Sequence, residues 1–199
     1  MSKLFVNEIA PRTGSTVSIA GLSANTRETL VMLCDGQSYT SQSGTYTSTN
    51  ITQEQVMTTT YEDISGSSIS YTPPSGTTMV IYEFVFSYSF VDANTITHFK
   101  SFIDSDEITS QRQSVQTYSA MNEEYHHTFL IPIGGSADTA TGRQATWSGA
   151  KTLKIQGRSY SGSYEARVHS LRNWDGATTG TTPMIRKPYL IITSLGSGA

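Results

Sequence analysis

The chain has 199 residues, of which 15% are charged, and its formal net charge is −3. This length suffices for one domain of good size or for a small module plus a domain, and the low charge provides no basic surface for nucleic acid or for an anionic membrane. The single cysteine, Cys34, excludes an intramolecular disulfide and is expected to be a small buried side chain. No run approaches the ~18 apolar residues of a membrane span, and the N-terminus lacks the apolar core of a signal peptide. We therefore expect a nearly all-β protein that is made in the cytoplasm and is not exported by that route.

Residues 1–20 form a predicted attachment arm. Two strand-like runs, residues 4–9 and 15–19, flank a turn that contains Pro11 and Gly14. A hairpin of this size does not bury enough surface to be stable alone in water, so we expect contacts outside the body of the protein to order it. The side chains expected to fit pockets of a partner are Phe5, Ile9, Val17 and Ile19.

Residues 21–74 form a predicted connecting segment of strands and loops. The apolar run at residues 30–33 fits either helical turns or a buried strand, because periodicity cannot decide at this length. Residues 35–50 are rich in Gly, Ser, Thr and Tyr, which favours a loop or a thin strand lying on another surface. A β pattern resumes at residue 53 and is stopped by the turn signal of Pro73 and Pro74.

The body of the protein is predicted to comprise residues 75–199, organised around a long strand at residues 79–91. Side chains in this run alternate, and its even positions from Val80 to Phe90 carry five aromatics, which need an opposing layer. If the odd face is wetter, Val85 should matter less to stability than Phe86.

Later strands are predicted at regular spacing. Turns at residues 92–94 and 104–106 predict that residues 79–91, 95–103 and a strand opening at residue 107 form a meander. Further strands are predicted at residues 112–118, 125–133, 152–161, 166–174 and 189–194. With no convincing long amphipathic helix, this pattern predicts an all-β fold, a jelly-roll-like antiparallel β-sandwich with a small N-terminal hairpin or arm.

Two parts of the chain resemble short fibre-type virion proteins of tailed bacteriophages, notably those of marine and cyanobacterial hosts. The opening from Leu4 to Ile19 has the pattern of an apolar strand, Asn-Glu-Ile, a short basic turn with Thr-Gly, and a second strand. Residues 80–84, 97–104, 125–129 and 188–192 are similar to the C-terminal jelly-roll-like domains of those proteins, over roughly residues 75–195. The resemblance implies a homotrimer about a three-fold axis and a location in the virion.

The sequence predicts no catalytic, metal-binding or cofactor-binding residues. His126 and His127 are adjacent in a strand, so their rings face opposite ways and cannot bind one ion from a single chain. A three-fold axis could gather three copies of one ring, but a structural role is favoured, as it is for His98 and His169. Residues 104–107 have acidic oxygens without the calcium-binding loop pattern, which favours a hairpin turn.

Catalytic motifs are missing from the sequence. It has no Gly-x-Ser-x-Gly, no His-Glu-x-x-His and no glycine-rich phosphate loop. Glu123 and Glu124 are adjacent, so they diverge in a strand and cannot form a glycosidase pair by themselves. We therefore expect a protein that is not an enzyme.

Trp147 and Trp174 are the candidate surface or receptor contacts. Both are flanked by Gly, Ser, Asn or Asp, a composition that suits stacking on a sugar, although each could instead cover an end of the core.

Three functions fit these observations. The first is a short tail fibre or related appendage that docks onto other virion proteins through residues 1–20 and presents loops to the host surface. The second is a capsid decoration or cement protein that uses the same arm to clamp shell subunits. The third is a carbohydrate-binding module that holds a host-surface glycan at Trp147 and Trp174.

Overall fold

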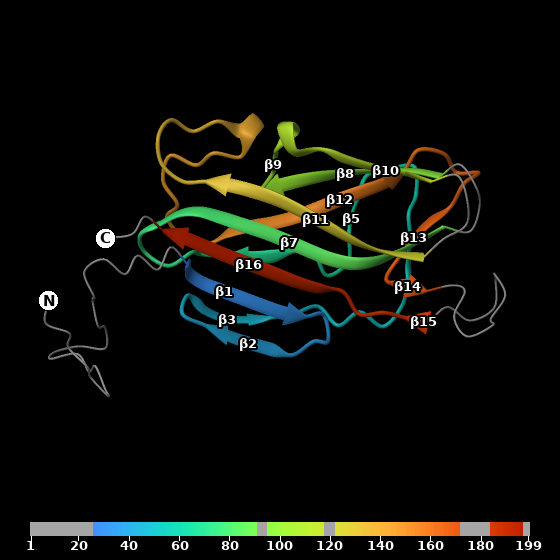
Figure 1. The fold of residues 1–199 in the computed structure, drawn as a ribbon, viewed down its shortest axis with the longest axis horizontal. Coiled ribbons are helices and arrows are strands. Elements are labelled where there is room, and N and C mark those ends of the chain that lie inside the picture. The colour runs from blue at the N-terminus through green and yellow to red at the C-terminus, as the bar shows by residue number, and fades with distance from the viewer. Residues whose placement is uncertain (1–25, 91–94, 118–121, 172–183, 197–199) are drawn as a thin grey trace, which may run out of the picture.

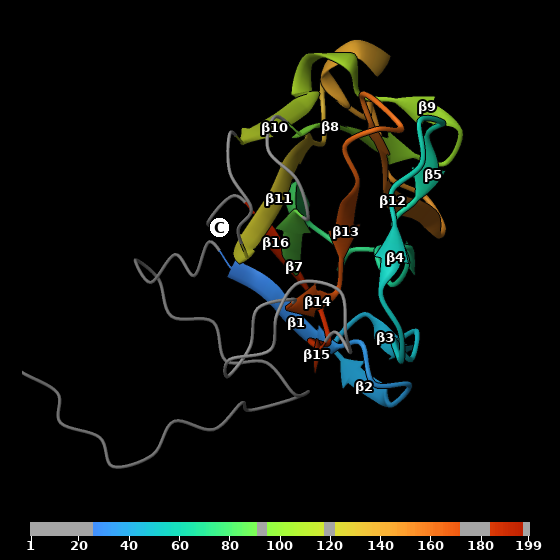
Figure 2. The same cartoon turned by 90° about the vertical axis from the view of Figure 1, so that its right-hand side faces the viewer.

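The structure, a computed structural model, describes residues 26–90, 95–117, 122–171 and 184–196. Two six-stranded sheets dominate it, and every ladder between named strands in them is antiparallel. The sheets lie one behind the other in Figure 1 and side by side in Figure 2. This arrangement confirms the predicted all-β antiparallel sandwich.

The β7 sheet is built around β7 (Thr77–Phe90), which corresponds to the long predicted strand. One edge of β7 pairs with β11, and the other pairs with β16 and, toward its C-terminal end, with β13. β1 pairs with β16, and β4 pairs with β13. These strands are β1 (Thr26–Leu33), β4 (Gln55–Val56), β11 (Asn122–Pro132), β13 (Ala166–Val168) and β16 (Tyr189–Gly196).

The β8 sheet forms the second layer around β8 (Thr95–Ile103) and β12 (Lys151–Ser159). Its shorter members are β5 (Glu62–Asp63), β6 (Ile69–Tyr71), β9 (Asp106–Glu107) and β10 (Gln113–Thr117). The remaining elements are the hairpin of β2 (Ser38–Ser41) with β3 (Gly44–Thr47), the pair β14 (Ser170–Leu171) with β15 (Met184–Ile185), and 3-10 helices at Thr109–Gln111 and Thr139–Thr141.

The predicted meander is confirmed between β8 and β9 but is wrong between β7 and β8, which lie in opposite sheets. β11 and β16 already occupy the two edges of β7, whereas β8 pairs with β9, β10 and β12. Residues 95–103 therefore face β7 across the core, with the Phe86 and Phe99 ring centroids 5.8 Å apart. β7 therefore does not form a hairpin with the next strand, β8. It pairs with strands more distant in the sequence, and aromatic side chains of both sheets are buried between the two layers.

The core lies between the sheets on the even face of β7, as predicted. Val80, Tyr82, Phe84, Phe86, Tyr88 and Phe90 are all buried. Each aromatic ring buries about 150–250 Å², which corresponds to about 4–6 kcal/mol of transfer free energy. Tyr82 stacks on Phe129 of β11 with centroids 4.4 Å apart, so the rings also join neighbouring strands.

Gly157 allows β12 to pack closely against this core. A Cβ atom at this position would lie 2.6 Å from Met57 Cε and 2.9 Å from the Ile64 side chain, closer than packed atoms approach. A larger residue would force the side chains of Met57, Ile64 and Phe99 to shift.

The segment before the body contributes strands to both sheets. Residues 30–33 are part of β1, and β6 pairs with β12. Glu28 of β1 lies buried and accepts hydrogen bonds from Ser43 N and Tyr71 Oη, each at 2.7 Å. Burial alone would raise the pKa of Glu28, but these donors hold it below its ordinary value. The boundary expected between the connecting segment, residues 21–74, and the body, residues 75–199, stays a prediction.

Candidate functional site: the outer face of the β7 sheet

The predicted attachment residues Phe5, Ile9, Val17 and Ile19 lie outside the described residues, and so does Trp174. Their roles stay predictions.

Trp147 packs at one end of the core. Its ring meets that of Tyr71 edge to face, with centroids 6.4 Å apart, and the side chain is half-buried. Its indole N–H is buried and has no hydrogen-bond partner within the described ranges. This position fits a residue that covers the end of the core, and a contact with a receptor stays a prediction.

His126 and His127 point to opposite faces of β11, as strand periodicity predicts. His127 Nε2 lies 2.9 Å from Ser101 Oγ inside the core, and burial lowers the pKa of His127 to about 4. His126 lies on the other face, where its Nδ1 is 2.6 Å from Glu83 Oε1. The hydrogen bond to Glu83 raises the pKa of His126 above its ordinary value.

His169 divides the strand predicted at residues 166–174. Its φ of 70° lies in the left-handed region, which ends β13 at Val168 and starts β14 at Ser170. The ring is buried edge-on against Phe84 and Phe86, and burial lowers its pKa to about 4. His98 lies instead on the outer side of β8, where partial burial and nearby Arg158 lower its pKa.

The acidic stretch at residues 104–107 is a hairpin turn between β8 and β9, as predicted. Asp104 has a φ of 55° and accepts a hydrogen bond from the backbone N–H of Thr152 at 2.8 Å. Glu107 forms ion pairs with Lys100 and Arg112. Over the described ranges, no three His, Cys, Asp or Glu side chains are placed to hold a metal ion.

Cys34 is buried, as expected. Burial raises the pKa of its thiol to about 12, so the reactive thiolate form is disfavoured.

The most distinctive surface is the side of the β7 sheet that faces away from the β8 sheet, where β1, β16, β7 and β11 lie next to one another (Figure 1). We call this the outer face. The pairing registers place its side chains in rows across the strands: Leu33, Tyr189, Val85 and His126; Val31, Ile191, Glu83 and Thr128; Thr29, Thr193, Ile81 and Leu130.

Aliphatic side chains on the outer face are exposed to solvent. Val31 is 53% exposed, Leu130 44% and Leu33 41%, while Ile81 and Ile191 between them are half-buried. Contiguous apolar patches of more than a few hundred Å² are uncommon on monomeric proteins and mark interaction sites. The arrangement therefore has the character of an interaction surface.

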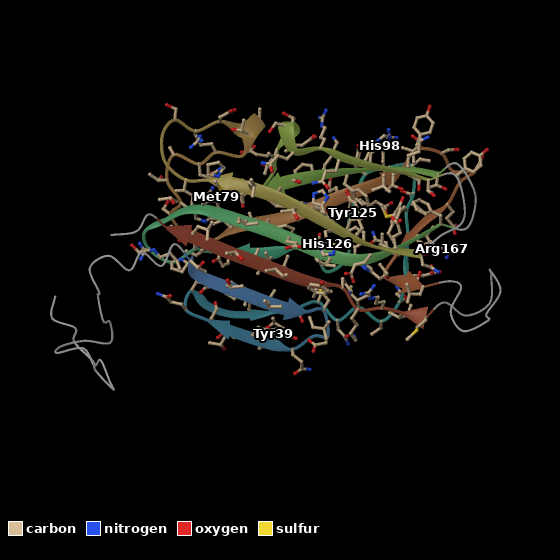
Figure 3. The ribbon with its side chains drawn as sticks, in the orientation of Figure 1. Tyr39, Met79, His98, Tyr125, His126 and Arg167 are labelled. Atoms are coloured by element: carbon tan, nitrogen blue, oxygen red, sulfur yellow. The ribbon has the colours of Figure 1, made fainter. Side chains whose placement is uncertain are left out.

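Charged groups on the outer face form a small network among these aliphatic residues, with Glu83 of β7 in register between Ile191 and Thr128. Figure 3 labels His126 on β11 and Met79 near the start of β7. His126 contacts both Glu83 and Glu124, and Glu124 pairs with Arg186. The charges of both signs are thus paired within the chain.

Residues 49–56 and Ser65 line a shallow polar hollow beside β4. Glu54, at its rim, is held by an ion pair with Arg167 and by Ser170 Oγ at 2.8 Å. Because these contacts fix its carboxylate, Glu54 has a structural role in the packing of β13 and β14.

Sequence reasoning missed the outer face, although a signal for it was present. Residues 30–33, 129–131 and 189–192 are continuous apolar runs, which are typical of strands buried on both faces. Only the strand pairing shows that these three runs lie in one sheet with their odd and even side chains on opposite sides.

Comparisons with known proteins do not assign the chain to a family. Within the described ranges, no helix is long and apolar enough to cross a membrane. No protein-family model matches the chain, and no curated protein matches it. The chain is similar to a chain in a solved structure of infectious bursal disease virus, Gx strain, with a TM-score of 0.37 and 9% identity over 96% of this chain. It covers 41% of the length of that viral chain.

Proposed function

We propose that this protein is a non-enzymatic structural subunit of a bacteriophage particle. The observation that carries the proposal is the outer face, where aliphatic Val31, Leu33 and Leu130 are exposed on strands whose inner side packs in the core. Such strands are expected in a protein whose working state is an assembly. The resemblance of residues 4–19 and 75–195 to fibre-type virion proteins supports a phage particle as that assembly.

Within that class we propose a homotrimeric short tail fibre or related appendage. Residues 1–20 would dock onto a neighbouring virion protein by adding strands to its sheet, with Phe5, Ile9, Val17 and Ile19 entering pockets. The sandwich would form the body that projects from the particle. A capsid decoration protein would use the same parts at another place in the particle, so location separates the two.

The test is complementation of the phage that carries the gene with a gene lacking residues 1–20. We expect the truncated protein to be made and folded but missing from purified particles when these are quantified by mass spectrometry. A matched gene with Tyr160→Ser, a change at an exposed body residue, should restore normal copy number. Antibody labelling in electron micrographs of complemented particles then shows whether the protein lies on the tail or on the shell. Normal incorporation of the truncated protein would show that attachment lies in the body, and absence of the full chain from particles would overturn the virion assignment.

A further inference from the structure

Two long strands, β1 and β11, lie at edges of the β7 sheet, and their outward backbone groups are protected to different degrees. β16 pairs with one side of β1, and β7 pairs with one side of β11. The other side of an edge strand presents N–H and C=O groups that attract a further strand, so proteins usually block or cover such edges. The protection of each edge therefore indicates where a further strand can bind.

The edge of β11 is blocked by side-chain amides. Gln111 donates from Nε2 to Leu130 O and accepts at Oε1 from the Leu130 N–H, each at 2.8 Å, as a neighbouring strand would. Gln113 Nε2 donates to Thr128 O at 2.9 Å. Pro132, at the end of the strand, has no N–H to donate. A further strand could bond to residues 128–132 only by displacing these contacts.

The edge of β1 is open. The Cys34 N–H donates to Pro188 O at 2.9 Å, so even positions of β1 bond to β16 and odd positions direct their N–H and C=O away from it. Thr29 and Val31 are such odd positions, and no described residue bonds to the outward backbone groups of either. Residues 29–33 contain no charge and no proline, and Val31 is 53% exposed. This edge therefore has the form of an acceptor for a β-strand.

We propose that residues 15–19 of the same chain add to β1 as an antiparallel strand. The chain that precedes the described residues leads directly into β1, and residues 20–25, which include Gly21, have a length that is common between adjacent strands. Residues 15–19 consist of Ser, Thr, Val and Ile, and residues 13–25 carry no charge, which suits the uncharged edge. A segment tethered so close to the edge meets it at a high effective concentration.

The inference rests on the proposed function, in which residues 1–20 are an attachment arm, and it assigns different partners to the two strands of that arm. Residues 15–19 extend the β7 sheet and fix the base of the arm to the body. Residues 4–9 then form the outer strand, which adds to the sheet of a neighbouring virion protein. Val17 and Ile19 share one face of the extended sheet, where that protein can still contact them. Part of the order expected from contacts outside the body thus comes from β1.

The test measures amide hydrogen exchange at single residues of β1 in the full-length chain by NMR. We expect the Thr29 and Val31 amides to exchange on the order of tenfold more slowly than in the double variant Thr16→Pro with Val17→Pro. Adjacent residues of a strand direct their N–H groups to opposite edges, so one of the two prolines removes a bond to β1 in either register.

Two controls separate an exposed edge from a loss of the fold. The Leu30 and Met32 amides bond to β16, so their exchange should be the same in the full-length chain and in the double variant. A matched double variant, Val6→Pro with Asn7→Pro, changes the first strand of the arm and should leave exchange at β1 unchanged.

Three results would overturn the inference. The first is exchange of the Thr29 and Val31 amides in the full-length chain at the rate of an unstructured peptide, a result that needs no variant. The second is faster exchange caused by the prolines at residues 6 and 7 alone, which would make residues 4–9 the occupant. The third is protection that disappears on dilution together with dissociation in light scattering, which would assign the strand to a neighbouring copy.

Failure of the proposed function is distinguishable from failure of this inference. A chain whose β1 amides are unprotected but which enters particles through residues 1–20 contradicts only the pairing of residues 15–19 with β1. A chain whose β1 amides are protected but which is missing from particles contradicts only the virion assignment.

Discussion

The two faces of the β7 sheet use the same strands for different purposes. The inner face carries aromatic rings and a neutral histidine, His127, all covered by the β8 sheet. The outer face carries aliphatic side chains and His126, whose side chain is 50% exposed and is paired with carboxylates. The comparison shows that apolar residues on both sides of a strand do not imply equal burial in one chain. The inner face stabilises the fold, and the outer face is available to a neighbour.

The largest expected effect is at the centre of the inner face. Phe86→Ala removes a ring that contacts Phe84, Phe99 and Tyr125, so lost burial and a cavity should lower the free energy of unfolding by about 3–5 kcal/mol. Urea denaturation of the variant and of the parent measures the difference. A loss below about 1 kcal/mol would mean that the inner face is not the core.

Acid should destabilise the inner face through His127 and His169. The folded pKa of each is about 4 and lies below the ordinary value of 6.5, so the unfolded state binds more protons between these values. The stabilisation is complete above about pH 6.5 and is lost as the pH falls, by ~3 kcal/mol for each fully neutral ring.

The measurement is the free energy of unfolding at pH 7.5, 5.5 and 4.5 for the parent and for His127→Gln. We expect a smaller loss on acidification in the variant, since one titrating group is gone. An unchanged pH dependence would contradict the buried neutral state of His127.

Val85 tests the boundary between the two faces. It was expected to matter less than Phe86 if its face was wetter, but that face is not wet at this point: Val85 is only 1% exposed, between His126 and Tyr189 in register. Val85→Ala should therefore cost about 1–2 kcal/mol, less than Phe86→Ala because fewer atoms are removed. A cost equal to that of Phe86→Ala would show that the outer face contributes to the core of the single chain as much as the inner face does.

The smallest effect is expected at His126. Because Glu83 raises the folded pKa of His126, its contribution is present below about pH 6.5 and is lost as the pH rises through the folded pKa. The side chain is half-exposed, so solvent screening limits the contribution to less than about 1 kcal/mol. His126→Gln should shift the urea midpoint slightly at pH 5.5 and not at pH 8.5, which is opposite in sign to the pH dependence at His127.

Local pattern predicted much of the fold but not the partners of its strands. The boundaries of β8 agree with the predicted strand at residues 95–103, and β7 and β11 lie within a few residues of their predictions. The split at His169 was not predictable, because a left-handed conformation of a non-glycine residue has no reliable sequence signal. The outer face was missed because each apolar run was considered alone, without its neighbours in the sheet.

The sequence by itself determined that this chain is an all-β protein with one strongly aromatic strand face, because period-two alternation depends only on neighbouring residues. It also determined that His126 and His127 point to opposite sides of their strand. The tertiary structure decided that β8 crosses to the second sheet and that β1, β16, β7 and β11 bring three apolar runs together. Those outcomes depend on pairings between residues as distant as Thr26 and Leu195, where competition among all possible strand edges determines the neighbour.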